Sequence, residues 1–333
     1  MNWSFILTSA LYTAISVQSI GFILAAIGLN VHFGFTGLLN FGQAVFAAAG
    51  AYAIAVPVAR YGWSVWEAIP MVFVAAIVAS LLFGIPTLRL RADYLAIVTI
   101  AAAEIVRLVL TSARVSWLFG GAEGLQKFTR DLEKLNPFPA HRYLPFGAGT
   151  QSFGEYDLFI IVIGWVLVVL VSVIVYLLVR SPWGRALKSI REDEDAARSL
   201  GKNVFAYKLQ SLALGGVIGA FGGVILAVGG RSASPNDYST AFTFFAWTVM
   251  ILGGVGKVKG PIIGGVIYWF ILGFVENFLA QATREKLLPH WLVTENNFGL
   301  WRFMLTGIGL SLLVIFRPQG VFGDRREQAF DVR

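Results

Sequence analysis

The sequence predicts an all-α fold: a polytopic integral membrane protein with about eight to ten spans, some of them broken helices. Hydrophobic residues make up 57% of the 333 residues and charged residues only 14%, against about 25% charged in a soluble domain. Uncharged stretches of about 20 residues, enough to cross a bilayer, recur along the chain. Because lipid cannot satisfy backbone polar groups, these stretches are expected to be helices. We expect one transmembrane domain over residues 1–333.

The first third of the chain contains four predicted membrane segments. No charged side chain occurs before Arg60, and one helix is expected at residues 5–29. Glycines then interrupt the pattern, so we expect a non-helical break near residues 35–43, followed by a helix at 43–58. Two further spans are expected at residues 68–88, ending near Pro86, and at 94–112.

The rest of the chain holds a long polar excursion and the remaining spans. Residues 113–156 are too rich in proline and glycine to cross a bilayer and are expected to form a small cap outside the membrane. The later spans are expected at residues 158–179, 209–230, 238–256, 261–278 and 298–316.

The densely charged stretch at residues 181–203 lies between two of these spans and must therefore sit in water. Ser181 and Pro182 are suited to start a helix, and Gly201 is suited to end it. Apolar residues recur at helical spacing between them, which predicts one short amphipathic helix. Such a helix can dock a soluble partner or lie on lipid headgroups. Four consecutive acids at 192–195 disfavour the second reading, because anionic headgroups attract basic faces.

Lysine and arginine gather in the cytoplasmic loops of membrane proteins. If the 181–203 loop is placed inside and the spans alternate, the inner segments hold more of the 26 lysines and arginines than the outer ones. The 181–203 helix and the C-terminus are therefore expected in the cytoplasm, and the 113–156 excursion outside.

Composition also excludes several classes of function. The chain has no cysteine and three scattered histidines, so no metal site is expected. The net charge of +7 is explained by loop cations rather than by binding to nucleic acid. No paired carboxylates, histidine clusters or serine–base motif stand out within the spans, so we do not expect an enzyme.

The break near residue 40 is the first candidate for a translocation path. Irregular backbone at membrane depth occurs where protein or a water-filled cavity satisfies it, and such breaks often face substrate. In the alternative, the glycines only allow close packing and the amides bond between helices. The path candidates are Thr36, Gly37, Asn40, Phe41, Gly42 and Gln43.

Glu104 and Arg107 lie three residues apart within a predicted span and can pair on one helix face. They are either a gate or latch, or a neutralised structural pair near the outer interface. The glycines at 253–256, with Gly260 and Pro261, form a second expected break.

Several motifs resemble bacterial high-affinity branched-chain amino acid ABC transporter permeases of the LivM type. They are GLNVHFGFTGLLNFGQ at 28–43, RLRADYLAIVT at 89–99, EIVR at 104–107, SPWGRA at 181–186 and LGGVG at 252–256. The stretch EDAARSLG at 194–201 is similar to the EAA loop by which importer permeases engage their ATPase, although Asp195 departs from the literal motif.

The resemblance implies one membrane-spanning subunit of an ATP-driven importer in the bacterial plasma membrane. Its partners would be a second, LivH-like permease, two cytoplasmic ATPases and an extracytoplasmic substrate-binding protein. No G-x-x-x-x-G-K-[ST] loop occurs, so ATP and Mg²⁺ would be bound by the ATPases and no cofactor by this chain. The residues assigned to ATPase coupling are Arg185, Arg191, Glu192, Asp193, Glu194, Ala196, Ala197 and Gly201.

The substrates that the resemblance implies are leucine, isoleucine and valine. Urea, short amides or aromatic acids remain alternatives within the same architecture. A stand-alone secondary transporter is a more distant alternative. It is disfavoured because the spans contain few acids that could couple to protons or sodium, mainly Glu104 and Glu276.

Overall fold

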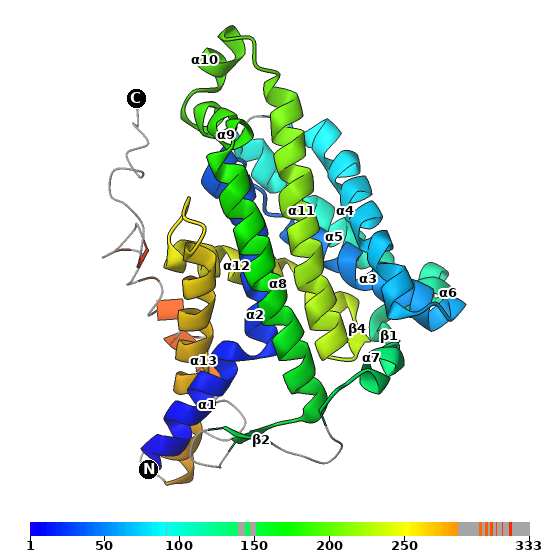
Figure 1. Ribbon diagram of the computed structural model, residues 1–333, viewed down its shortest axis with the longest axis vertical. Helices are drawn as coiled ribbons and strands as arrows, with labels where there is room; N and C mark the ends of the chain where they lie inside the picture. Colours follow the sequence, from blue (N-terminus) through cyan, green and yellow to red (C-terminus); the bar gives the residue numbers. More distant parts are fainter. Residues whose placement is uncertain are drawn as a thin grey trace.

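The computed structural model describes residues 1–90, 92–138, 144–146 and 151–285, and single positions between 300 and 321. Long helices dominate these regions, and several of them run along the long axis of the molecule (Figure 1). The larger helices are α1 (Trp3–Ile15), α2 (Val17–Leu29), α3 (Gln43–Tyr61), α4 (Val65–Thr87), α5 (Ala92–Thr111), α8 (Glu155–Arg180), α9 (Pro182–Glu192), α11 (Val204–Gly229), α12 (Thr240–Gly253) and α13 (Gly260–Arg284). Short helices are η1 (Asn30–Gly34), η2 (Ala113–Val115), α6 (Ser116–Phe119), η3 (Gly121–Glu123), α7 (Arg130–Lys134), α10 (Glu194–Ser199) and η4 (Pro235–Tyr238).

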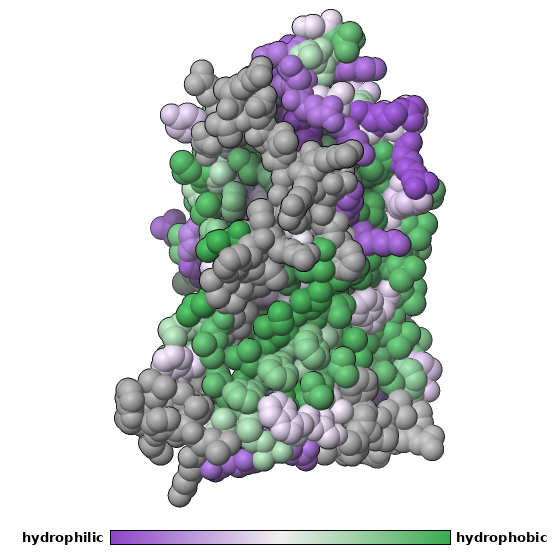
Figure 2. Space-filling view, turned by 90° about the vertical axis from the view of Figure 1, so that its left-hand side faces the viewer, coloured by the Kyte–Doolittle hydropathy of each residue, from purple (hydrophilic) through white to green (hydrophobic). Residues whose placement is uncertain are grey.

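Seven described helical segments are long and apolar enough to cross a membrane, and α1 and α12 are shorter apolar helices. Figure 2 shows a broad apolar band between polar ends, as a bilayer requires. The exposed faces of α4 and α8 are rich in large apolar side chains such as Leu82 and Val166. The predicted helical membrane bundle is therefore confirmed. The expected span at 298–316 lies mostly outside the described residues.

The prediction of one helix at residues 5–29 is wrong, because the chain breaks at Ser16. Its backbone is extended (φ −66°, ψ 167°), which ends α1 and starts α2. The Ser16 hydroxyl donates to the Thr13 carbonyl at 2.8 Å and accepts from the Ser19 amide at 3.5 Å. Serine thus offers the backbone local hydrogen bonds that compete with a continuous helix.

The described loops lie at two ends of the bundle. At one end, the α4–α5 connection packs beside the start of α11 through Leu88, Leu95 and Phe205. At the other end, strand β1 (Leu125–Gln126) pairs antiparallel with β4 (Ser232–Ala233). This pairing fastens the 113–156 excursion to the α11–α12 loop. A second small antiparallel pair joins β2 (Leu144–Phe146) to β3 (Gln151–Phe153).

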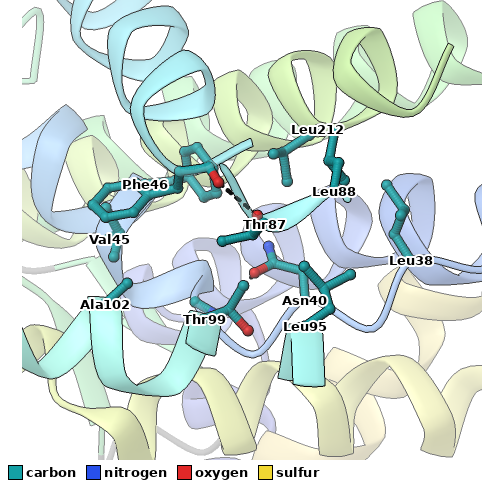
Figure 3. A pocket seen from close by; sticks show the side chains of 12 residues that line it. Leu38, Asn40, Val45, Phe46, Thr87, Leu88, Leu95, Thr99, Ala102 and Leu212 are labelled. Atoms are coloured by element: carbon teal, nitrogen blue, oxygen red, sulfur yellow. Dashed lines mark hydrogen bonds between the residues drawn. The ribbon is translucent and has the colours of Figure 1, made fainter. Parts of the chain in front are cut away.

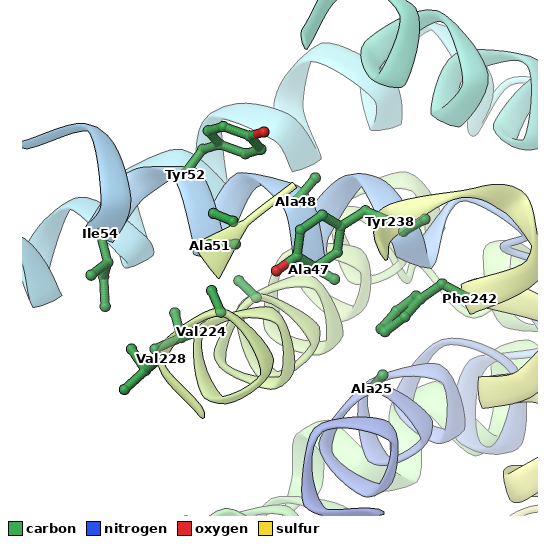
Figure 4. Close-up of a cluster of buried hydrophobic side chains, with 14 of the residues drawn as sticks. Ala25, Ala47, Ala48, Ala51, Tyr52, Ile54, Val224, Val228, Tyr238 and Phe242 are labelled. Carbon is green, nitrogen blue, oxygen red and sulfur yellow. The ribbon is translucent and has the colours of Figure 1, made fainter. Parts of the chain in front are cut away.

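Helix α11 lies at the centre of the bundle, against α2 and α3. The contact with α3 is close because small residues line it. A Cβ atom on Gly50 would lie 2.1 Å from the Ala220 carbonyl oxygen, and one on Gly223 only 1.9 Å from that of Ala47. Alanines and valines fill the adjoining core, with Tyr238 and Phe242 at its side (Figure 4). Backbones pack at this distance only where side chains are small.

Candidate functional site

The predicted break near residue 40 is present and defines the candidate site. Helix α2 continues into the π-helix η1, and residues 37–42 are non-helical before α3 begins. Gly37 has φ +77°, a conformation that favours glycine. The backbone groups freed at membrane depth need partners inside the protein.

A buried polar network supplies many of these partners. His32, Asn40 and Gln43 are at most 2% exposed. The Asn40 amide lies 3.0 Å from Nδ1 of His32, whose Nε2 lies 3.1 Å from the Leu212 carbonyl. The side-chain oxygen Oδ1 of Asn40 accepts from the Gly42 backbone N–H at 2.8 Å, and the Gln43 side chain donates to the Ala25 backbone carbonyl at 3.2 Å. The network ties the break to α2 and α11.

The other predicted path residues also bond within the chain. Thr36 donates to the Val31 carbonyl at 3.0 Å and lies 2.7 Å from the Ser211 hydroxyl. The Phe41 ring stacks on Trp247 with centroids 4.7 Å apart. Trp247 also donates to the Asn40 carbonyl at 3.0 Å. Helices α11 and α12 therefore clamp the break from two directions.

The cavity beside the break is narrow in this conformation. It has a volume of about 20 Å³ and mostly apolar walls from α3, α4, α5 and α11, with Asn40 among its lining residues (Figure 3). That volume holds about one water molecule. Of the six predicted path residues, Asn40 and Gly42 line this cavity. The break is thus closed to a larger solute.

His32, Ser211 and Trp247 belong to this site but were not singled out from the sequence. His32 is the clearest omission, because it is a titratable side chain in a mostly apolar segment and lies within the motif at 28–43. Polar residues at membrane depth commonly mark functional positions. Ser211 and Trp247 reach the break only through tertiary packing, which no local pattern records.

The second glycine break meets the first through Asn30. The Asn30 amide donates to the Lys257 carbonyl at 3.0 Å, and its oxygen accepts from the Gly256 amide at 2.9 Å. Asn30 itself is 1% exposed, and its two partners in the loop are half-buried. One side chain therefore joins η1 to the loop between α12 and α13.

The charged stretch at 181–203 forms two helices, not the single helix expected. Ser181 and Pro182 start α9 as predicted, with the Ser181 hydroxyl accepting from the Gly184 amide at 3.4 Å. Asp193 then adopts extended backbone (φ −152°, ψ 107°) and accepts from the Ala196 amide, which starts α10. An aspartate that caps a new helix interrupts the first one. Gly201, with φ +76°, follows the end of α10.

Arg191 connects α9 to the break. Its guanidinium donates a hydrogen bond to the Gly34 carbonyl, at the last residue of η1. The same side chain passes Gly37, where an added Cβ would lie 3.4 Å from the Arg191 Cγ. A residue of the charged 181–203 stretch thus reaches the irregular backbone of the break directly.

The other residues assigned to ATPase coupling divide into exposed and inward-facing groups. Glu194 accepts from Arg198 and Lys208, which fixes α10 to the start of α11. Ala197 is 2% exposed and packs in a small core with Ile190 and Val204. The residues open to solvent are Arg185, Glu192, Asp193, Ala196 and Gly201. Ala197 therefore holds the helix pair together rather than facing a partner.

Glu104 and Arg107 form the ion pair that their spacing predicts. Arg107 also donates to the Asn236 side chain at 3.1 Å, in the α11–α12 loop. The pair therefore lies at the end of the bundle opposite α9. A structural ion pair near the boundary between membrane and water would occupy such a position.

We expect Arg107→Gln to lower the free energy of unfolding by about 1 kcal/mol, because the pair is partly exposed. Solute uptake should stay close to wild type. Thermal unfolding in detergent and vesicle uptake measure the two effects, with Arg114→Gln, an exposed cation beyond the same helix, as the control. Loss of uptake at unchanged stability would instead show a gate.

A second, polar hollow lies toward the opposite end from α9. It has a volume of about 870 Å³ and lies between α1, α2, α8, α11, α12 and α13. Its described lining includes three carboxylates, from Asp157, Asp237 and Glu276, and no lysine or arginine. Burial raises the pKa of Asp237 above its ordinary value. No group of three or more histidine, aspartate or glutamate side chains in the described regions could hold a metal ion.

The family described as "Branched-chain amino acid transport system / permease component" matches residues 11–315. The chain is 30% identical to the high-affinity branched-chain amino acid transport system permease protein LivM of Salmonella typhimurium, over 94% of this chain and 70% of that protein. It is 31% identical to LivM of Escherichia coli, over 92% and 69%. A probable LivM of Methanocaldococcus jannaschii is 25% identical over 91% and 90%. No solved structure gives a significant match.

Proposed function

The chain belongs to the family of permease components of branched-chain amino acid transport systems, and we propose that it imports leucine, isoleucine and valine. It works as one membrane-spanning subunit of an ATP-binding-cassette importer. Urea, short amides or aromatic acids would use the same architecture and are the alternative substrates.

We propose that two cytoplasmic ATPases, a second LivH-like permease and an extracytoplasmic binding protein complete the importer. ATP and Mg²⁺ are bound on the ATPases. The exposed residues of α9 and α10, including Arg185 and Glu192, offer the ATPase a charged surface at one end of the bundle. We propose that the protein lies in a bacterial inner membrane, with α9 and the C-terminus on its cytoplasmic side.

The observation that carries the mechanism is the hydrogen bond from Arg191 to the Gly34 carbonyl. A displacement of α9 by the ATPase would be transmitted to η1 through this bond, and the same side chain passes beside Gly37. The break at residues 37–42 is the closed point of the path in the present conformation, since its cavity has room for about one water molecule. Moving η1 would loosen the His32–Asn40 contact and so open the cavity at the break.

We propose that the solute, released by the binding protein, enters the polar hollow at the end of the bundle opposite α9. Its volume of about 870 Å³ is within the usual range of small-molecule sites. Its carboxylates suit a solute that carries an ammonium group, as amino acids do.

The test is uptake of labelled leucine into vesicles that contain this chain and its co-encoded subunits. We expect uptake to require ATP and to be reduced severalfold by excess unlabelled isoleucine or valine, because one site serves all three. Urea, acetamide and phenylalanine are the matched competitors and should have little effect. If only urea, acetamide or phenylalanine competes, the substrate belongs to one of the alternative classes. Uptake that continues without the ATPases would refute the proposal of an ATP-driven importer.

A further inference from the structure

A second large hollow, distinct from the candidate path, lies at the α9 end of the bundle. It has a volume of about 990 Å³ and lies between the end of α8, the start of α9 and the α12–α13 loop. Its described lining includes five basic side chains and no acidic one. The basic residues of this "basic hollow" are Arg180, Arg185, Lys188, Lys257 and Lys259.

Both arginines of the basic hollow are held in place by their neighbours. The Arg180 guanidinium lies over the Tyr176 ring, 4.1 Å from its centroid. Arg185 donates to the Arg180 carbonyl at 3.3 Å. Neither contact neutralises the charge of an arginine, so these two guanidinium groups keep a positive potential at the hollow.

The rest of the lining is largely apolar. Phe35, Val179, Val258 and Ile263 contribute side chains to the same hollow. Just below it, α8 exposes Val173 and Leu177, which are 52% and 62% accessible. The hollow therefore joins a cationic rim to the lipid-facing surface of a membrane span. A site of this composition suits an amphiphile better than a small hydrophilic anion.

The depth of the hollow leads to the same conclusion. Helix α8 ends at Arg180 and α13 begins at Gly260, so the five cations lie where two spans meet water. This is the level of the lipid headgroups, and basic pockets between membrane helices on the cytoplasmic side bind anionic headgroups.

We propose that the basic hollow binds an anionic phospholipid of the leaflet on the α9 side. Its phosphate contacts the arginines and lysines, and its acyl chains follow Val173 and Leu177 along α8. An acidic segment of the ATPase is the competing occupant. The apolar half of the lining and its continuity with the lipid-facing surface favour the lipid. The proposal does not depend on which solute is transported.

Native mass spectrometry of the intact importer, supplied with phosphatidylglycerol or phosphatidylcholine, tests the proposal. Wild type should retain phosphatidylglycerol in preference to phosphatidylcholine. Lys259→Gln, an exposed position, should weaken retention about fivefold, and Arg180→Gln with Lys257→Gln and Lys259→Gln about a hundredfold. The triple variant Lys127→Gln, Arg130→Gln and Lys134→Gln removes the same charge at the opposite end and should retain the lipid as wild type does.

Three outcomes would overturn the proposal. Unchanged lipid retention in the Arg180, Lys257 and Lys259 variant would place the lipid elsewhere. Loss of the ATPases with lipid retention intact would make the hollow a protein contact. Displacement of the lipid by millimolar glycerol phosphate would make the basic hollow a site for small anions. A lipid that also binds through its acyl chains should resist such displacement.

Discussion

Replacing Arg191 with alanine is expected to reduce ATP-driven leucine uptake by about 5- to 150-fold, the range of typical coupling energies between two sites. The side chain is the direct hydrogen-bonded link from α9 to the Gly34 carbonyl. Without it, η1 loses a charge-assisted bond and α9 can move without carrying the break along. The exposed face of α9 is unchanged, so the ATPases should still bind.

Uptake and ATP hydrolysis, measured on the same vesicles, distinguish uncoupling from failure to assemble. We expect hydrolysis to continue in Arg191→Ala while uptake falls. Lys202→Ala is the matched control, because it removes an exposed cation from the loop after α10. If both variants transport like wild type, the Arg191 contact is not the route of coupling. Equal loss of uptake and ATPase binding would make Arg191 a docking residue instead.

Replacing Gly253 with alanine is expected to destabilise the fold by about 3 kcal/mol or more, the upper range for inserting volume into a packed core. An added Cβ would lie 1.7 Å from the Gly260 carbonyl oxygen and 2.4 Å from its carbon. Both obstacles are backbone, so no side-chain rotation relieves them. The α12–α13 turn would have to separate, taking the Gly256 amide and Lys257 carbonyl away from Asn30.

The yield of monodisperse protein and its thermal unfolding in detergent measure this effect. Gly307→Ala is the control, because a Cβ there meets nothing within 4 Å. Wild-type yield and stability for Gly253→Ala would mean that the two helices are not packed this closely. A loss shared with Gly307→Ala would trace the effect to glycine substitution in general rather than to the turn.

The helical bundle and its breaks could be predicted from sequence because they depend on local composition. Long uncharged stretches mark α4, α8 and α11 whatever their neighbours are, and the glycines at 34–42 mark the break. The interruptions at Ser16 and Asp193 were not predicted. Both depend on whether one short polar side chain bonds back to its own backbone, and neighbouring residues do not decide that choice.

The direction in which a side chain points was the least predictable feature of the site. Arg191 and Ala197 were grouped with the exposed coupling residues, yet Arg191 reaches the break and Ala197 is buried. The kink at Asp193 reorients α10, so Leu200, which the periodicity of a single helix places on the apolar face with Ala197, is 80% exposed. Asn30 joins loops 226 residues apart in sequence, a contact that only the packed bundle reveals.

The most direct test of the account is the accessibility of the break during transport. The chain has no native cysteine, so a single introduced cysteine reports on it without background. Phe41→Cys should react with a membrane-impermeant thiol reagent only when the assembled importer is cycling with ATP. Ala76→Cys, buried in α4, should stay unreactive, and Lys202→Cys should react in every state. Reactivity of Phe41→Cys that is the same with and without ATP would contradict a path that closes at this break.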